Sequence, residues 1–289
     1  MSKSVLVTGA NSGIGLLTAL ELAGAGWDVV GSVRSLAKAE LVQEAAADRG
    51  VAVRTVLLDV DDADSCREGV AKAQEVTGGL DALVNNAGYA QSGAVEDVTD
   101  DLVRRQLETN VVAPARLARL VLPGMRERGS GKIVNVSSAA GRVSIPLVGW
   151  YCASKHALEA MTDALRMEVE PDGISVVLVE PGMFGTDIWS AAQGGAFPPA
   201  TTARYAAAYA HAEALGGRSD KLPDPVWVAR TVRLALANPL PLARYVVGAD
   251  AVGGILAEQL VPTVVVDYVK SVASGLKRMP LRIPFLPGG

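Results

Sequence analysis

Residues 8–15 read Thr8-Gly9-Ala10-Asn11-Ser12-Gly13-Ile14-Gly15, between an apolar run that begins at Ser4 and a stretch rich in Leu and Ala. This order predicts a strand, a tight turn and a helix. Gly9 gives the turn its backbone freedom, Gly13 lets the backbone approach a ligand, and Gly15 lets the helix pack close to the strand. The free N–H groups and positive dipole end of such a helix bind a pyrophosphate. The spacing G-x-x-x-G-x-G is a variant of the dinucleotide fingerprint, so we expect a dinucleotide here.

After this turn, short β-branched runs alternate with longer Ala-rich stretches. The alternation predicts an α/β fold: a Rossmann-type doubly wound, mainly parallel seven-stranded sheet with helices on both faces. The expected strands are 4–8, 28–33, 53–58, 82–85, 132–136, 175–179 and 244–247. The expected helices are 14–25, 36–49, 62–77, 99–128, 151–170 and 225–237. Pro114 and Pro123 are expected to bend the long helix.

The whole chain is expected to form one dinucleotide-binding catalytic domain, because 289 residues without an internal repeat or flexible linker favour a single domain. Residues 186–224 are rich in Ala, Gly and Pro and predict a partly helical excursion, or lid, over a substrate. Residues 253–289 are expected to form an apolar C-terminal tail.

The composition excludes several classes of protein. Hydrophobic residues make up 49% and charged residues 20%, which rules out a disordered chain. A net charge of −4 gives no general attraction for nucleic acid. No apolar run reaches about 18 residues, so no transmembrane segment is expected. No signal peptide precedes the first strand, and we expect a cytoplasmic protein. The four Cys and His residues lack metal-ligand spacing, so no metal site is expected: Cys66, Cys152, His156 and His211.

The end of the second strand selects between NAD and NADP(H). An NAD-binding protein has an acidic residue there for the ribose 2′-hydroxyl. Here Arg34 follows the strand, and Asp28 lies at its entrance. A guanidinium suits a 2′-phosphate, and Ser12 lies in reach of the same group. NADP(H) is therefore the expected cofactor, the alternative being that Arg34 is a solvated surface charge.

A phenol and an ammonium are predicted to share one helix face, because Tyr151 and Lys155 are four residues apart. A phenol has a pKa of about 10, and a nearby ammonium lowers it. Such pairs are common in helices, so the spacing alone decides little. Ser138 lies at the end of a predicted strand, however, where open α/β sheets bind their ligands.

Together these segments resemble the short-chain dehydrogenase/reductase family, and residues 29–36 and 180–186 resemble its branch of hydroxysteroid and retinol dehydrogenases. The resemblance covers about residues 4 to 190 and is weaker to about 250. The matching residues are Thr8-Gly9-Ala10-Asn11-Ser12-Gly13-Ile14-Gly15, Asp59-Val60, Asn85-Asn86-Ala87-Gly88, Asn110, Ser138, Tyr151 with Lys155, and Pro181-Gly182 with Thr186.

The resemblance implies four catalytic residues. Tyr151 would act as the general acid/base, and Lys155 would lower its pKa and bind the nicotinamide ribose. Ser138 would orient the substrate oxygen, and Asn110 would hold a water that links Lys155 to solvent. The residues implied to bind NADP(H) are Gly9, Ser12, Gly13, Ile14, Gly15, Arg34, Asp59, Val60, Asn86, Ala87, Gly88, Tyr151, Lys155, Pro181, Gly182, Phe184 and Thr186.

The implied function is an NADP(H)-dependent oxidoreductase that interconverts a secondary alcohol and a ketone, or acts on an aldehyde. A lipophilic small-molecule substrate is expected from the apolar residues around Ser138 and Tyr151. They are residues 141–150, Tyr89, Ala90, Met183, Phe184, Ile188, Trp189 and 197–199. The alternatives are a catalytically silent dinucleotide sensor, an NAD-dependent dehydrogenase and an epimerase relative.

A homodimer or homotetramer is expected, because the helices expected over 99–128 and 151–170 carry more Leu than one core face needs. These residues are Leu117, Leu120, Leu158 and Leu165.

Overall fold

In the computed structural model, which describes residues 2–186, 188, 203–216 and 222–277, seven strands form one parallel sheet. The strand order is β3-β2-β1-β4-β5-β6-β7, so it reverses between β1 and β4. The strands are β1 (Ser4–Val7), β2 (Asp28–Val33), β3 (Arg54–Leu57), β4 (Ala82–Asn85), β5 (Gly131–Val136), β6 (Ile174–Pro181) and β7 (Arg244–Val247). The predicted fold class is confirmed.

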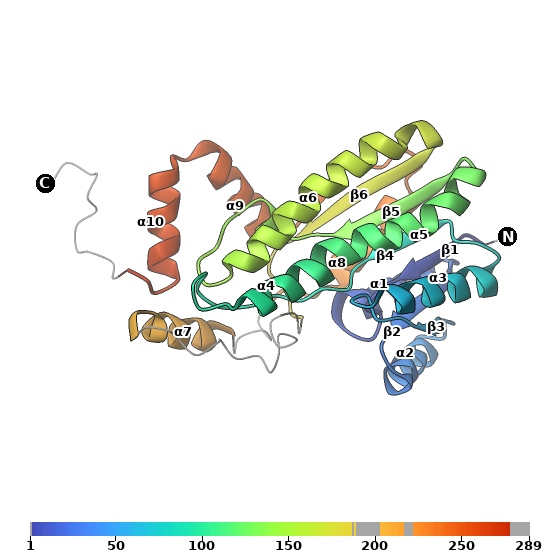
Figure 1. Cartoon of the computed structure of the whole chain (residues 1–289), viewed down its shortest axis with the longest axis horizontal. Coiled ribbons are helices and arrows are strands. Elements are labelled where there is room, and N and C mark those ends of the chain that lie inside the picture. The colour runs from blue at the N-terminus through green and yellow to red at the C-terminus, as the bar shows by residue number, and fades with distance from the viewer. Residues whose placement is uncertain (1, 187, 189–202, 217–221, 278–289) are drawn as a thin grey trace, which may run out of the picture.

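Helices cover both faces of the sheet (Figure 1). On one face, α1 (Gly13–Gly24), α2 (Leu36–Asp48) and α8 (Val226–Ala237) pack on the sheet. On the other face lie α3 (Ala63–Thr77), α5 (Ala113–Glu127) and α6 (Gly149–Val169). The predicted boundaries of the strands and of these helices lie within two residues of the observed ones, apart from the long helix described below.

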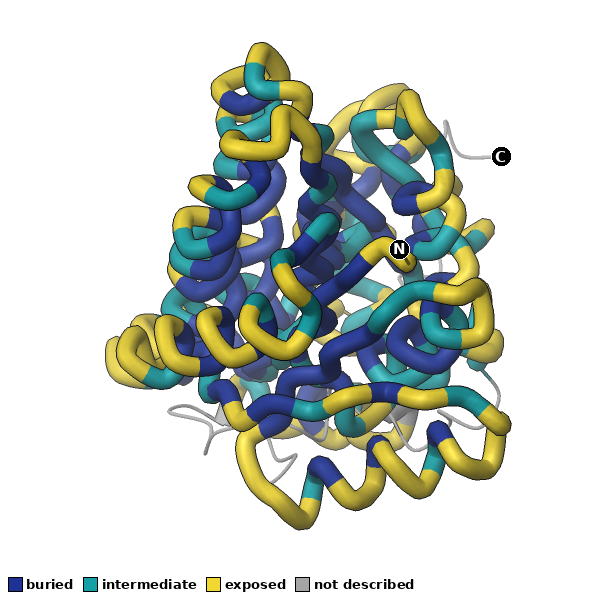
Figure 2. The backbone as a smooth tube through the Cα atoms, turned by 90° about the vertical axis from the view of Figure 1, so that its right-hand side faces the viewer, coloured by how far each residue is buried: buried dark blue, intermediate teal, exposed yellow. Residues whose placement is uncertain are grey.

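The core consists of two apolar layers, one on each side of the sheet. Side chains alternate along β1: Val5 and Val7 pack toward α1 and α8, whereas Leu6 packs toward α3 and α5. The strands run through the dark interior of Figure 2, and the outer turns of the helices are exposed. Burial on both faces explains why the strands are nearly continuous runs of β-branched and aliphatic residues.

The glycine turn joins β1 to α1 at the point where the strand order reverses. Gly9 and Gly13 have φ values of +65° and +51°, a region that side chains disfavour. At Gly15 a Cβ atom would lie 2.2 Å from the carbonyl oxygen of Gly9 and 2.4 Å from the Asn86 amide nitrogen. The Asn86 amide donates to the carbonyl oxygen of Thr8 at 2.9 Å. The turn is therefore packed directly against the end of β4.

The predicted helix over 99–128 is three segments. They are α4 (Asp100–Leu107), a π-helical turn (Glu108–Val112) and α5. Pro114 lies in the first turn of α5, directly after the π-helical turn, and Pro123 lies inside that helix. Bends at the prolines stay a prediction; the irregular turn, Glu108–Val112, ends two residues before Pro114.

The segments expected to be irregular contain helices. Within 186–224 the structure describes α7 (Ala203–Gly216), so the excursion is partly helical as predicted. The expected C-terminal tail begins as two helices, α9 (Ala249–Leu260) and α10 (Thr263–Ala273), separated by a break at Pro262. Residues 278–289 of that tail lie outside the described residues. None of the helices that the structure describes has the length and hydropathy to cross a membrane.

The contact at Gly15 predicts that Gly15→Ala lowers the free energy of unfolding by about 1–3 kcal/mol, the usual cost of overpacking. The added methyl would meet backbone, which cannot move aside as a side chain can. Gly24→Ala, on the same helix with nothing within 4 Å of its Cβ position, is the matched control and should not destabilise the chain. Urea denaturation measures both; equal stability of the two variants would contradict the prediction.

Candidate active site

A cleft of about 1010 Å³ opens over the carboxyl ends of β1, β2 and β4. This is the place where the strand order reverses and where open α/β sheets bind ligands. Twelve of the predicted cofactor residues line it: Gly9, Ser12, Gly13, Ile14, Gly15, Arg34, Asp59, Val60, Asn86, Ala87, Gly88 and Thr186. The structure thus brings together residues that are far apart in sequence.

One end of the cleft is cationic. Arg34 is exposed at the end of β2, and Lys38 in the first turn of α2 lines the same cleft. Ser35 begins that helix, and its hydroxyl accepts from the Lys38 N–H at 3.4 Å. Lys38 is not among the residues predicted from sequence; a second cation shortly after Arg34 is the signal that could have indicated it.

The loop after β3, the strand next to β2, brings Asp59 and Asp61 to the same cleft. The Asp61 N–H donates to Asp59 Oδ1 at 3.2 Å, and the Thr109 hydroxyl donates to Asp61 Oδ1 at 2.7 Å. The Arg116 guanidinium donates to the carbonyl oxygen of Val60 at 2.8 Å. These bonds fix the loop after β3 against the π-helical turn, so the wall of the cleft is held in one position.

Ser138, Tyr151 and Lys155 meet at the carboxyl end of β5. The Ser138 hydroxyl is hydrogen-bonded to Tyr151, and it also donates to the carbonyl oxygen of Pro181 at 3.4 Å. Tyr151 lies in the first turn of α6 and is 3% exposed. Lys155 is 5% exposed; its ammonium donates to the carbonyl oxygen of Val136 at 2.9 Å and lies 5.9 Å from the centre of the Tyr151 ring.

Burial controls the ionisation of this pair. Desolvation raises the pKa of Tyr151 to about 12, although its hydrogen bond with Ser138 acts in the opposite direction. Desolvation also lowers the pKa of Lys155 to about 8, against the attraction of Glu159. The sequence analysis expected a lowered Tyr151 pKa; burial dominates instead. At neutral pH the phenol is therefore protonated and can act as a proton donor.

Asn110 lies in the π-helical turn and is 1% exposed. Its amide nitrogen donates to the Tyr89 carbonyl at 3.0 Å and to the Ser154 hydroxyl at 3.1 Å. Its amide oxygen accepts from the Tyr89 N–H at 3.2 Å. Asn110 thus links the loop after β4 to the helix that carries Tyr151 and Lys155, and a π-helical turn is often found at such functional positions.

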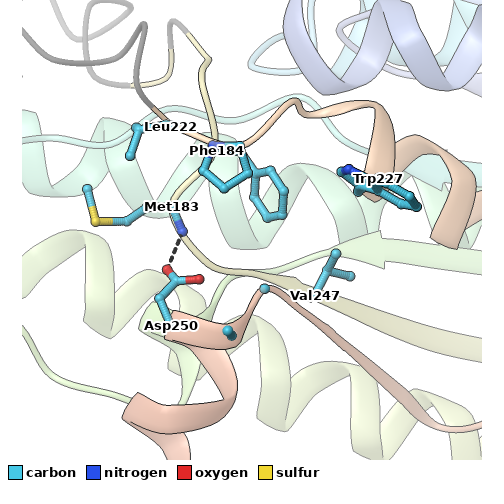
Figure 3. A pocket seen from close by; sticks show the side chains of 9 residues that line it. Met183, Phe184, Leu222, Trp227, Val247 and Asp250 are labelled. Atoms are coloured by element: carbon cyan, nitrogen blue, oxygen red, sulfur yellow. Dashed lines mark hydrogen bonds between the residues drawn. The ribbon is translucent and has the colours of Figure 1, made fainter.

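The loop after β6 is held by a residue that the sequence analysis missed. Asp250, at the start of α9, accepts the Met183 N–H on Oδ2 at 2.6 Å (Figure 3). Its carboxylate also fills the space beside Gly182, where a Cβ would lie 2.3 Å from both carboxylate oxygens. A polar residue just after the last strand is the signal that could have indicated it. The loop from Pro181 to Thr186 is therefore tied to the far edge of the sheet.

Some expected site residues lie elsewhere. Met183 and Phe184 line a separate apolar cavity of about 590 Å³ with Trp227, Val247 and Asp250, and the Phe184 ring is part of the core (Figure 3). Pro181, Gly182, Tyr151 and Lys155 are not among the residues that line the cleft. Trp189 and residues 197–199, which were expected in the substrate wall, lie outside the described residues.

The family model of short chain dehydrogenases matches residues 3–195. The chain belongs to the short-chain dehydrogenase family. Over 271 residues it is 34% identical to the NADPH-dependent 3-dehydrocapnine reductase of Ornithobacterium rhinotracheale. This alignment covers 91% of this chain and 94% of the relative.

Two solved structures extend this comparison. A short-chain dehydrogenase from Streptomyces avermitilis is similar at a TM-score of 0.80 and 35% identity, over 96% of this chain and 98% of that one. A variant of the actinorhodin polyketide ketoreductase with NADPH has a TM-score of 0.72 and 30% identity, over 88% and 97% of the two chains. The fold of this short-chain dehydrogenase is thus shared along nearly its whole length.

Proposed function

We propose that this short-chain dehydrogenase is an NADP(H)-dependent oxidoreductase that interconverts a ketone and a secondary alcohol on a lipophilic small molecule. The observation that carries the proposal is the meeting of Ser138, Tyr151 and Lys155 at the end of β5. Two of the similar proteins are reductases that are named with NADPH, which supports reduction as the direction.

The residues of the cleft fit NADP(H). Its glycine turn lines the cleft at the start of α1, where free backbone N–H groups can bind a pyrophosphate. Arg34 and Lys38 provide two cations where a 2′-phosphate would lie. When bound, NADPH supplies the two electrons of the reduction as a hydride.

The chain's own residues supply and control the proton. The protonated Tyr151 hydroxyl donates its proton to the carbonyl oxygen as that oxygen gains negative charge. Tyr151 is left as a phenolate, whose charge the Lys155 ammonium offsets in a site from which water is largely excluded. Ser138 holds the substrate oxygen beside Tyr151, because its hydroxyl already lies in hydrogen-bonding contact with the phenol.

The surroundings of Tyr151 favour an apolar substrate. Tyr151 packs in a cluster with Ala90, Ala140, Val148 and, partly buried, Ile188. Such a wall provides few partners for the several hydroxyl groups of a sugar, and each unpaired one costs about 1–3 kcal/mol. Buried apolar ligand surface contributes about 25 cal/mol per Å² instead.

The cationic end of the cleft predicts that NADPH binds more tightly than NADH. Arg34→Asp should weaken NADPH binding by about 2–4 kcal/mol, because a charge-assisted contact becomes a repulsion. Arg230→Asp, an exposed arginine on α8 that does not line the cleft, makes the same change in net charge and is the control. Titration calorimetry with both nucleotides measures these affinities. Equal affinity of the wild-type chain for NADPH and NADH would contradict the prediction.

Tyr151→Phe should lower the rate of ketone reduction by about 10²–10⁴-fold, the usual size of general-acid catalysis, while NADPH still binds. The rate is followed by NADPH absorbance. Tyr245→Phe removes a hydroxyl from β7, outside the site, and serves as the control. A Tyr151→Phe variant that keeps more than about a tenth of the activity would exclude Tyr151 as the acid.

The rate of ketone reduction by the wild-type chain should also fall as the pH rises through about 8, where Lys155 loses its proton.

The apolar cluster predicts that kcat/KM rises along a series of ketones with increasing chain length or number of rings. Each added methylene that becomes buried contributes about 0.8 kcal/mol, which is roughly fourfold in kcat/KM. A polyol or ketose of similar size is the control and should react poorly. A flat series, or a preference for the sugar, would show that the substrate is not lipophilic.

A further inference from the structure

Two buried carboxyl groups lie directly behind the three catalytic residues, and the mechanism above does not use them. Glu180, with no exposed surface, is the residue before Pro181 in β6. Glu159 is 5% exposed and lies one helical turn after Lys155 on α6. Carboxylates are rarely buried to this extent unless they are paired.

Two arginines compensate part of this charge. Arg244 of β7 places its Nε 3.1 Å from Glu180 Oε1 and 3.1 Å from Glu159 Oε2. Arg142, in the segment after Ser138, lies 3.6 Å from Glu180 Oε1. Among the residues that the structure describes, two further charged groups lie beside this cluster, Lys155 and Asp163 of α6; Asp163 accepts from Arg244 Nη2 at 2.5 Å. Arg244 is therefore shared among three carboxyl groups.

The hydrogen bonding of the two carboxyl groups is incomplete. Glu159 Oε1 and both oxygens of Glu180 are buried and accept no hydrogen bond from the part of the chain that the structure describes. Two carboxylates cannot donate to each other, whereas one proton between them turns one group into a donor. Burial first, and Glu159 second, raise the pKa of Glu180 to about 7. The pair thus behaves like two carboxyls that hold one proton between them.

The pair also connects the pieces of the site. A Cβ on Gly141 would lie 2.9 Å from Glu159 Cγ and 2.9 Å from the Ser137 hydroxyl, so the turn after Ser138 is packed onto Glu159. Glu180 immediately precedes Pro181, whose carbonyl oxygen accepts from the Ser138 hydroxyl. One cluster therefore contacts the Ser138 turn, the Lys155 helix and the Pro181 loop.

We propose that Glu159 and Glu180 are positioning residues that share one proton. Together with Arg142 and Arg244, they hold three segments in fixed relative positions: the turn after Ser138, the helix that carries Lys155 and the loop that begins at Pro181. The positioning role rests on the proposed function, whereas the shared proton does not.

Infrared spectroscopy of the wild-type chain tests the shared proton without any substrate. We expect the carbonyl band of a protonated carboxylic acid at pH 6 and its loss as the pH rises through about 7. Glu180→Gln replaces this carboxyl group by an amide, whose N–H groups donate at every pH, so the band should be absent from this variant. Glu168→Gln, an exposed glutamate on the same helix, should leave it in place. Absence of the band from the wild-type chain at pH 6, or its persistence in Glu180→Gln, would overturn the proposal.

Thermal unfolding gives a second measure. The pKa of Glu180 is raised from 4.5 to about 7, so between these values the folded chain holds a proton that the unfolded chain has lost. The stabilisation is complete below pH 4.5 and is lost as the pH rises to about 7. The Tm of the wild-type chain should fall over this range more steeply than that of Glu180→Gln. Parallel curves would count against the shared proton.

The positioning role is tested by kinetics at pH 6. Glu180→Ala, which leaves both arginines without this partner, should lower kcat for ketone reduction by about tenfold or more through misplacement of the Ser138 turn and the Pro181 loop. Glu180→Gln should restore most of that loss, because it keeps the shape of the side chain and supplies an N–H donor toward Glu159. Equal kcat values for the two variants would overturn positioning. A wild-type chain with the infrared band but no turnover of any ketone would instead refute the proposed function alone.

Discussion

The hydrogen bonds between Asn86 and the turn after β1 are the contact on which the site depends. The Thr8 hydroxyl accepts the N–H groups of Asn86 and Ala87 at 2.9 and 3.0 Å, and the Asn86 amide returns a bond to the Thr8 carbonyl. The strand order reverses between β1 and β4: strands β2 and β3 lie on one side of this pair, and strands β5, β6 and β7 lie on the other. The bonds keep the ends of the two strands together while the cleft opens above them.

Buried charge is the second theme of the site. Lys155, Glu159 and Glu180 are each at most 5% exposed, within one helix and the adjacent strand. Removing such groups from water is unfavourable, so their positions are fixed by the few partners that compensate them. The same desolvation keeps Tyr151 protonated. The fixed positions of these groups and the proton affinity of Tyr151 therefore have one physical origin, the exclusion of water from the carboxyl end of β5.

Much of the fold could be predicted from sequence, because the strands are buried on both faces and stand out as apolar runs between turns. The glycine turn was equally clear, since Gly9, Gly13 and Gly15 have few other uses at a strand-to-helix junction. The contacts that Asn110 makes from the π-helical turn could not be predicted, because Tyr89 and Ser154 are distant from it in sequence.

The same limit applies to the parts of the site that were missed. Asp250 and Arg244 act on residues more than 60 positions away, and neither belongs to a local pattern. The pKa of Tyr151 was expected in the wrong direction, because the spacing from Lys155 is visible in sequence whereas the depth of burial is not. Lys38 is different, since its distance from Arg34 was available from the start.

Both edges of the sheet are short strands that begin with arginine. β3 and β7 have four residues each, and Arg54 is paired with Asp28 of β2 at 2.5 Å as Arg244 is paired with Glu180 of β6. An exposed strand edge invites further strands to add to it, and short edges with charged side chains discourage such addition. Short length and charge at both edges are thus features that disfavour the addition of a further strand to this sheet.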